Sequence, residues 1–298
     1  MLDLFRLTVL STLARTGSVT ATARELGYAQ PSISHHLSRL EAEVGLPLTQ
    51  RAGRGIRLTP AGELLAHRAA EILGRVEAAE DELAALGGLR SGRVRVAGFQ
   101  SALSSVVTTA AGSMRTSAPA IELTLQDLHP DLALQQLREG LIDVAVVFRY
   151  DDEVPDGLRF THLFDDSMHL LSTEGGRTLE ESADAPWIAG CENCRRELVS
   201  ACAAAGFTPR IMYTSDDPVV QQSMVAAGLG VTTMPGLSVA QHRVPGVETT
   251  ELEDLRRRVH VATYGEPPDP PATAAFVRAV VEASRALVGG PSGRLSLS

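Results

Sequence analysis

Residues 29–41, AQPSISHHLSRLE, combine a core-facing stripe with a face of hydrogen-bonding side chains. Ile33, Leu37 and Leu40 recur at helical spacing, which predicts that one side of a helix is buried. The other side lacks the opposite-charge pairs typical of a solvated helix. It carries amides, hydroxyls, an imidazole and a guanidinium, at Gln30, Ser32, Ser34, His35, Ser38 and Arg39, with Pro31 near the start. These groups match the donors and acceptors on base edges in a DNA major groove, whereas a merely polar surface helix is the alternative interpretation.

The neighbouring segments predict a winged helix-turn-helix. Helices are expected over about residues 3–15 and 20–26, with Thr20 as the N-cap of the second. A short turn containing glycine then leads into the polar helix, which is the spacing of a helix-turn-helix. After Gly45, residues 46–62 predict two short strands, whose tip at 53–55 carries Arg54 and follows Arg51. This hairpin is interpreted as a basic wing, the alternative being an ordinary surface turn.

A long helix over 61–86 follows the wing. One side of it carries an apolar stripe that predicts a partner helix, made of Leu65, Ile72, Val76, Leu83 and Leu86. Glycines at 87–92 mark a domain boundary.

From residue 93 onward strands and helices alternate, which predicts a parallel sheet. A first unit has strands at 93–99, 121–128 and 142–148. A second has strands near 158–164, 167–172, 186–189, 210–214 and 230–235, and a last helix at 272–288 returns to the first unit.

Composition and charge limit the classes of function. The net charge is −9, but residues 1–60 carry +3 and the rest −12, which suits a small DNA-binding module on an acidic body. No apolar run is long enough for a membrane span, and the N-terminus lacks the features of a signal peptide. Three cysteines, an odd number in 298 residues, favour a reducing compartment, so we expect a cytoplasmic protein with no membrane partner.

Two cysteines form the sharpest other motif. Cys191 and Cys194 precede a predicted helix, whose positive end and the neighbouring Arg195 and Arg196 would lower a thiol pKa. Redox sensing and ordinary thiols both remain open. A zinc site needs about four ligands and only two cluster here, so we expect no metal. No phosphate-binding loop, dinucleotide-binding or Gly-x-Ser-x-Gly motif occurs, so we expect no enzyme activity and no cofactor.

Four segments resemble the LysR-type transcriptional regulators: 17–51, IRLTPAG (56–62), LREGLIDVAVVF (137–148) and AAGLGVTTMP (226–235). The resemblance covers nearly the whole chain. Two departures fall in the polar helix, where the family commonly has Ser or Thr at Ala29 and often Arg, Gln or Lys at His35 and His36.

The resemblance implies an α+β multidomain protein. Its parts would be a winged helix-turn-helix (1–60), a linker and dimerisation helix (61–90), and an effector-binding domain (91–298) similar to periplasmic solute-binding proteins. That domain would divide into subdomain I (about 91–161 and 267–290) and subdomain II (about 162–266).

The implied function is a ligand-responsive regulator that binds a partly palindromic operator in double-stranded DNA. The implied partners are a small-molecule effector, further copies of the chain in a dimer or tetramer, and RNA polymerase as a further candidate. The DNA contacts expected are Thr20, Gln30, Pro31, Ser32, Ser34, His35, Ser38, Arg39, Arg51 and Arg54. An alternative from another class is an α/β small-molecule binder or enzyme with a helical assembly module.

The effector is expected where parallel strands end, because ligands of open α/β sheets bind beyond the carboxyl ends of strands. The residues at those positions are Gln100, Ser101, His129, Phe148, Arg149, Ser215 and Thr233. A helix N-terminus and Arg149 together favour a small organic acid, although Arg149 could instead form a surface ion pair with Asp151 or Asp152.

Overall fold

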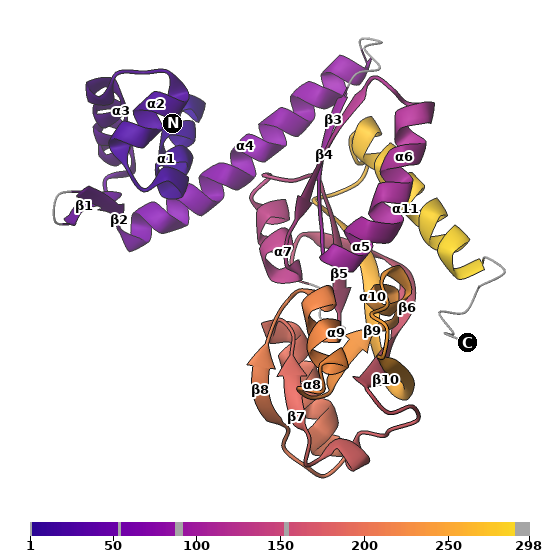
Figure 1. Cartoon of the computed structure of the whole chain (residues 1–298). Helices are drawn as coiled ribbons and strands as arrows, with labels where there is room; N and C mark the ends of the chain where they lie inside the picture. The colour runs from indigo at the N-terminus through magenta and orange to yellow at the C-terminus, as the bar shows by residue number, and fades with distance from the viewer. Residues whose placement is uncertain (1, 53–54, 87–91, 152–154, 290–298) are drawn as a thin grey trace.

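A small N-terminal head is joined by one long helix to a body of two lobes (Figure 1). The computed structural model describes residues 2–52, 55–86, 92–151 and 155–289. The head consists of α1 (Leu4–Thr16), α2 (Val19–Leu26), α3 (Gln30–Val44), β1 (Thr49–Ala52) and β2 (Gly55–Leu58), and the long helix is α4 (Pro60–Leu86). Among the described residues, no helix has the length and apolarity that crossing a membrane requires.

The head is a helix-turn-helix with an antiparallel hairpin, as the sequence predicts. Its core joins Leu10 of α1, Ile33 and Leu40 of α3 and Leu48 before β1, all fully buried. Ala66 and Ala69 of α4 pack on the same cluster, so the first turns of the long helix close the core of the head.

The N-cap expected at Thr20 is wrong. The helix begins one residue earlier, at Val19, and Ser18 is its N-cap, with its hydroxyl accepting from the backbone N–H of Ala21 at 3.5 Å. Thr20 is exposed inside the first turn. Ser and Thr are both good N-caps, and the sequence TGSVTAT offers four of them within seven positions, so spacing alone did not decide between them.

The body contains the remaining elements. In chain order these are β3 (Gly92–Gly98), α5 (Gln100–Ala102), the π-helical turn η1 (Leu103–Val107), α6 (Thr108–Ser117), β4 (Ile121–Asp127), α7 (Pro130–Arg138), β5 (Val144–Arg149), β6 (Leu158–Ser172), the 3₁₀ turn η2 (Glu180–Ser182), β7 (Pro186–Ala189), α8 (Glu192–Ala204), β8 (Arg210–Thr214), α9 (Pro218–Ala226), β9 (Thr232–Pro235), α10 (Gly236–Gln241), β10 (Glu248–Tyr264) and α11 (Pro271–Gly289).

The main sheet is mixed, which corrects the expectation of a parallel sheet. Its strand order is β4-β3-β5-β10-β6-β9. β3 pairs in parallel with β4 and β5, but β10 runs antiparallel to both β5 and β6. The two strands expected near 158–164 and 167–172 form one continuous strand, β6, and β10 was not expected from the sequence. A second, two-stranded parallel sheet pairs β7 with β8.

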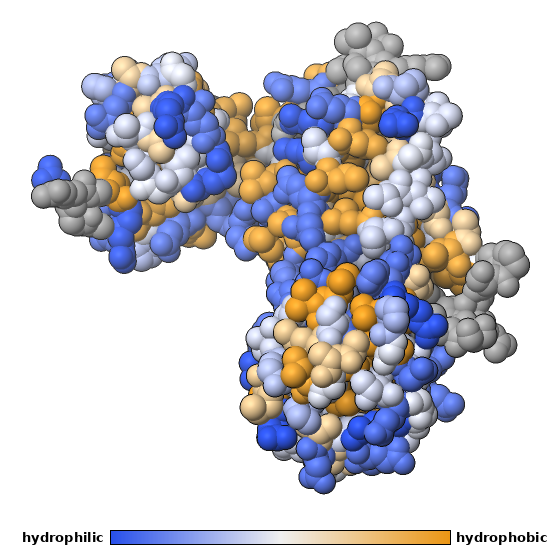
Figure 2. Space-filling model, viewed as in Figure 1, coloured by the Kyte–Doolittle hydropathy of each residue, from blue (hydrophilic) through white to orange (hydrophobic). Residues whose placement is uncertain are grey.

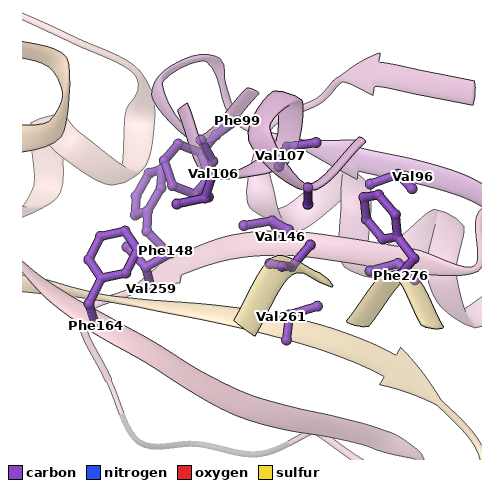
Figure 3. Close-up of a cluster of buried hydrophobic side chains, with 14 of the residues drawn as sticks. Val96, Phe99, Val106, Val107, Val146, Phe148, Phe164, Val259, Val261 and Phe276 are labelled. Carbon is purple, nitrogen blue, oxygen red and sulfur yellow. The ribbon is translucent and has the colours of Figure 1, made fainter. Parts of the chain in front are cut away.

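Alternate residues of the central strands face two different cores. Val96 and Val146 point into the larger core beneath α6 and α11, whereas Ala145 and Val147 point into a core beneath α7. Figure 3 shows Val146, Val261 and Phe276 in the larger core, with Phe99 and Phe148 together at one end of the cluster. β6 and β10 run from one lobe into the other, so the sheet itself joins the lobes (Figure 1).

Candidate functional sites

Most of the polar side of α3 is exposed in the described structure. Gln30, Pro31, His35, Ser38 and Arg39 are exposed, and Ser32 and Ser34 are half-buried. The opposite stripe holds α3 in the head, with Ile33 and Leu40 fully buried and Leu37 5% exposed. Ala29 precedes the helix without a side-chain cap, and Pro31 occupies the first turn.

Glu41 fixes the hairpin relative to α3, and sequence reasoning missed it. One carboxylate oxygen, Oε1, accepts from the backbone N–H groups of Leu48 and Thr49, each at 2.9 Å, and from the Thr49 hydroxyl at 3.0 Å. Hydrogen bonds to a charged group are the strong ones, so a single side chain sets the position at which β1 begins.

The hairpin is also tied to the long helix. Thr59 donates its hydroxyl to the carbonyl of Pro47 at 2.7 Å and accepts from the N–H of Gly62 at 3.1 Å. A Cβ at Gly62 would lie 2.0 Å from the carbonyl oxygen of Leu48, a distance that no side chain can occupy. The glycine in IRLTPAG is therefore needed for close backbone approach.

Only part of the predicted wing lies within the described residues. Arg51 is exposed on β1 and pairs with Ile56 of β2. Gly53 and Arg54, the predicted tip, lie outside the described residues.

A cleft of about 250 Å³ lies between the two lobes of the body. It is lined by Phe99, Gln100, Ser101, Asp127, Leu128, His129, Phe148, Gly190, Cys191, Cys194, Asp216, Pro218, Gln221, Thr233, Met234, Pro235, Ser238 and Arg257. This volume is below the range of about 300–1,000 Å³ usual for drug-sized ligands, so the cleft fits a small molecule.

Arg257 of β10 is the cation of this cleft, and it is only 3% exposed. Its guanidinium forms hydrogen bonds with the fully buried carboxylate of Asp166, the residue opposite it on β6, at 2.8 and 2.9 Å. Another of its N–H groups donates to the Ser101 hydroxyl at 2.9 Å. The guanidinium also lies 4.7 Å from the ring centre of Phe99 and 4.6 Å from that of Phe148, in cation–π contact.

Helix N-termini converge on the cleft. The helical segment 100–117, α7 and α8 all begin at lining residues, and none has a side-chain hydrogen bond at its N-cap (Phe99, His129 and Cys191). The first N–H groups of a helix lack intrahelical partners, and the helix dipole places partial positive charge there. Asp217 caps the neighbouring α9 through the N–H groups of Val219 and Val220.

Comparison with known proteins identifies the family. The model of the LysR substrate binding domain matches residues 87–285, and that of the bacterial regulatory helix-turn-helix protein, lysR family, matches residues 4–63. The chain belongs to the LysR family. It is therefore a ligand-responsive DNA-binding transcriptional regulator, built from a helix-turn-helix domain and an α/β effector-binding domain.

One relative and two solved structures span nearly the same length. YybE of Bacillus subtilis (strain 168), an uncharacterized HTH-type transcriptional regulator, is 27% identical over 254 residues, which are 82% of this chain and 84% of YybE. ArgP from Mycobacterium tuberculosis superposes with a TM-score of 0.70 at 21% identity, covering 95% of this chain and 98% of ArgP. Full-length CbnR, solved in complex with its target DNA, has a TM-score of 0.65 at 22% identity, covering 95% of this chain and all of CbnR.

The structure gathers five of the seven effector residues expected in this LysR-family chain. Gln100, Ser101, His129, Phe148 and Thr233 line the cleft. Ser215 lies just outside the lining, where its carbonyl accepts from the Gln221 side chain at 2.5 Å.

Arg149 is in the wrong place for the expected role. It is not among the lining residues of the cleft; it pairs with Asp151, and its guanidinium lies 4.8 Å from the ring centre of Phe160. Arg257, which the sequence analysis missed, is the arginine among the described residues that line the cleft. Alternation on β10 was the available signal, because Arg257 shares a face with the buried Val259 and Val261.

Cys191 and Cys194 both line the cleft, and their sulfur atoms are 3.1 Å apart. The hydrogen bond between the thiols lowers the pKa of Cys191 to about 6, and the same bond together with burial raises the pKa of Cys194 well above its usual value. Arg195 and Arg196 are not among the causes of these shifts, contrary to the sequence-based expectation. Within the part of the chain that the structure describes, no three His, Cys, Asp or Glu side chains gather as a metal site would require.

Proposed function

We propose that this regulator responds to a small carboxylic acid bound in the cleft between its lobes. The observation that carries the proposal is the convergence of two uncapped helix N-termini, those of segment 100–117 and α7, with the buried guanidinium of Arg257. Orphan N–H groups at helix starts bind carboxylates readily. The Ser101 hydroxyl accepts from Arg257, so its own proton is free to be donated to the acid.

The charges that line the cleft bear on whether its ligand is an acid or a base. Asp127, Asp216 and His129 also line it, and His129 lies 3.5 Å from Asp216 across the cleft. Both aspartates are exposed at the rim, whereas Arg257 is almost fully buried and paired with Asp166, so the inner end of the cleft offers an acid the Ser101 hydroxyl and helix N–H groups. A ligand fits both ends of the cleft if its carboxylate faces Ser101 and its neutral end faces the aspartates at the rim.

Calorimetric titration of the full-length protein with a panel of small carboxylic acids tests this proposal. We expect at least one acid to bind, and Ser101→Ala to weaken it by about 1–3 kcal/mol because a buried carboxylate oxygen loses its donor. Arg149→Ala is the matched control and should bind like the wild type, since Arg149 lies outside the cleft. Equal affinity in wild type and Ser101→Ala would place the acid elsewhere.

We propose that the exposed face of α3 and the hairpin are the DNA-contacting surfaces. The proposed DNA contacts are the residues expected from the sequence, including Thr20 in the first turn of α2. Among them, Gln30, Ser34 and His35 are the candidates for hydrogen bonds to base edges. Arg39 and Arg51 are exposed and suit phosphate contacts. A DNA target supports a cytoplasmic location for the chain and RNA polymerase as a further candidate partner. Relatives named as regulators support a role without catalysis.

A second copy of the chain is the proposed partner of α4. Leu64, Ile72 and Leu83 on this helix are 62%, 37% and 68% exposed. Figure 2 shows hydrophobic residues on the surface where α4 passes from the head to the body. Leu65 instead packs into the head core, and the side chain of Leu86 lies outside the described residues. Ile72→Asp should therefore lower the mass measured by light scattering, and an unchanged mass would contradict the pairing.

We further propose that the chain divides into a DNA-binding domain (1–60), a linker helix (61–90) and an effector-binding domain (91–298). We also propose that α7 transmits effector binding in the cleft to the head. The N-terminal end of α7 faces the cleft, where Asp131 accepts from Asn193 of α8 at 3.1 Å. Beyond its C-terminal end, Glu139 lies 3.5 Å from His67 of α4. A short rigid helix with one end in the cleft and the other on the linker can pass movement between lobes to the head.

A further inference from the structure

The thiol pair has the arrangement of a reactive disulfide site. Cys191 is the N-cap of α8, a helix of 13 residues, and Cys194 lies within its first turn. Both are free thiols whose sulfur atoms are 3.1 Å apart and open to the cleft. A Cys-x-x-Cys pair across the start of a helix is an arrangement in which one thiol is activated and the other is close enough to react with it.

The two thiols differ in pKa, as disulfide formation by an activated thiol requires. The hydrogen bond from Cys194 and its backbone N–H lower the pKa of Cys191, His129 acts in the same direction, and burial and Asp216 oppose them. Cys191 is therefore a thiolate at neutral pH, while Cys194 keeps its proton because its pKa is raised. Cys202, the third cysteine, is fully buried, and burial raises its pKa to about 11.

The size of the cleft limits what can oxidise the pair. A volume of about 250 Å³ between two lobes admits a small molecule but not the folded surface of a redox protein. Hydrogen peroxide, which accepts two electrons, is small enough to enter this space.

We propose that Cys191 and Cys194 form a peroxide-oxidisable pair that regulates this protein from inside the effector cleft. The Cys191 thiolate attacks one peroxide oxygen; the O–O bond breaks, the other oxygen leaves as hydroxide and takes up a proton, and Cys191 becomes a sulfenic acid. The Cys194 sulfur then attacks the Cys191 sulfur, the S–O bond breaks, and the Cys194 proton leaves with the hydroxyl as water. Two thiols lose two electrons, and hydrogen peroxide is reduced to two molecules of water.

Oxidation would reach the rest of the molecule through Asn193. This residue lies inside the four-residue loop that the disulfide closes, and its side chain donates to Asp131 of α7. Closing the loop changes the first turn of α8 and hence the contact that holds α8 to α7. This inference rests on the proposed function in one respect, namely that changes in the cleft and in α7 alter DNA binding by the head.

Peroxide treatment of the reduced full-length protein tests the inference. Peptide mass mapping should show a Cys191–Cys194 disulfide that dithiothreitol reverses. Cys194→Ser should instead accumulate a sulfenic acid at Cys191 that dimedone traps, and Cys202→Ala, the matched control, should form the disulfide like the wild type. Affinity for the DNA upstream of the coding sequence should change about five-fold or more on oxidation, as coupled sites typically do, and Cys191→Ser should show no change.

The outcomes separate this inference from the proposed effector. The inference is overturned if the two thiols of the wild-type protein stay reduced in peroxide, or if their disulfide forms without altering DNA affinity. Neither result depends on the folding of a variant. Acid binding to the reduced protein in that case leaves the proposed function intact. A disulfide that shifts DNA affinity in a protein that binds no acid supports the inference and overturns the proposed effector.

Discussion

Two glycines set the contact between the linker helix and the body, and replacing one of them gives a quantitative prediction. A Cβ at Gly74 of α4 would lie 2.6 Å from the Cα of Gly140, in the turn after α7. Ordinary carbon–carbon contacts are about 3.5–4.0 Å, so Gly74→Ala forces α4 and this turn apart by about 1 Å. The obstacle is backbone, which cannot rotate away as a side chain can.

Gly112→Ala is the matched control, because Gly112 is exposed on α6 and an added Cβ there meets nothing within 4 Å. Each substitution gains about 1 kcal/mol of helix propensity, and this gain cancels when the variants are compared. Overpacking at a close contact costs about 1–3 kcal/mol, so we expect Gly74→Ala to be less stable than Gly112→Ala by that amount.

Urea denaturation measures the difference, and hydrogen exchange locates it. We expect faster exchange in Gly74→Ala for the amide of Gly140, which bonds to the Leu137 carbonyl at 3.3 Å, and no change there in Gly112→Ala. Equal stability and equal exchange in the two variants would refute the packing of α4 on the turn after α7, and with it the proposed route from cleft to head.

Three further predictions concern the head and the thiols. Gln30→Ala should weaken binding to upstream DNA by about 1–3 kcal/mol and relax preference at particular base pairs, as competition with single-base variants of the site would show. Glu41→Ala leaves two backbone N–H groups unpaired where β1 begins, so thermal unfolding should show a loss of about 1–3 kcal/mol, whereas unaltered stability would mean that water replaces the carboxylate. Cys191 should react with iodoacetamide at a rate that rises with pH through a midpoint near 6, and a midpoint near 9 would contradict its assignment as the ionised thiol.

The helical head was predictable because local signals agree there. Apolar spacing, turn glycines and Pro31 in a first turn all mark the same helices. Only the cap was misassigned, because Ser18 and Thr20 are chemically alike. Glu41 was not predictable, since its partners, Leu48 and Thr49, are joined to it by the way in which the hairpin folds back on α3.

The strands that cross between lobes were harder to predict for a physical reason. β10 includes EDLRRR, a charged run that masks strand periodicity, and its pairing with β6 shifts register between Leu252 and Arg256. Arg257 and Asp166 are charges on the apolar faces of their strands, and they form an ion pair with each other. Buried charges are paired in folded proteins, but sequence alone did not show which pair would form 91 residues apart.

The central claim is that an acid in the cleft changes how the head binds DNA. The most direct test is the affinity of the full-length protein for its upstream DNA, measured by fluorescence anisotropy with and without the acid found by calorimetry. We predict a change of about five-fold or more in the wild type and in Arg149→Ala, and a much smaller change in Ser101→Ala at the same acid concentration. An acid that saturates the cleft of the wild type and leaves its DNA affinity unaltered would contradict the account.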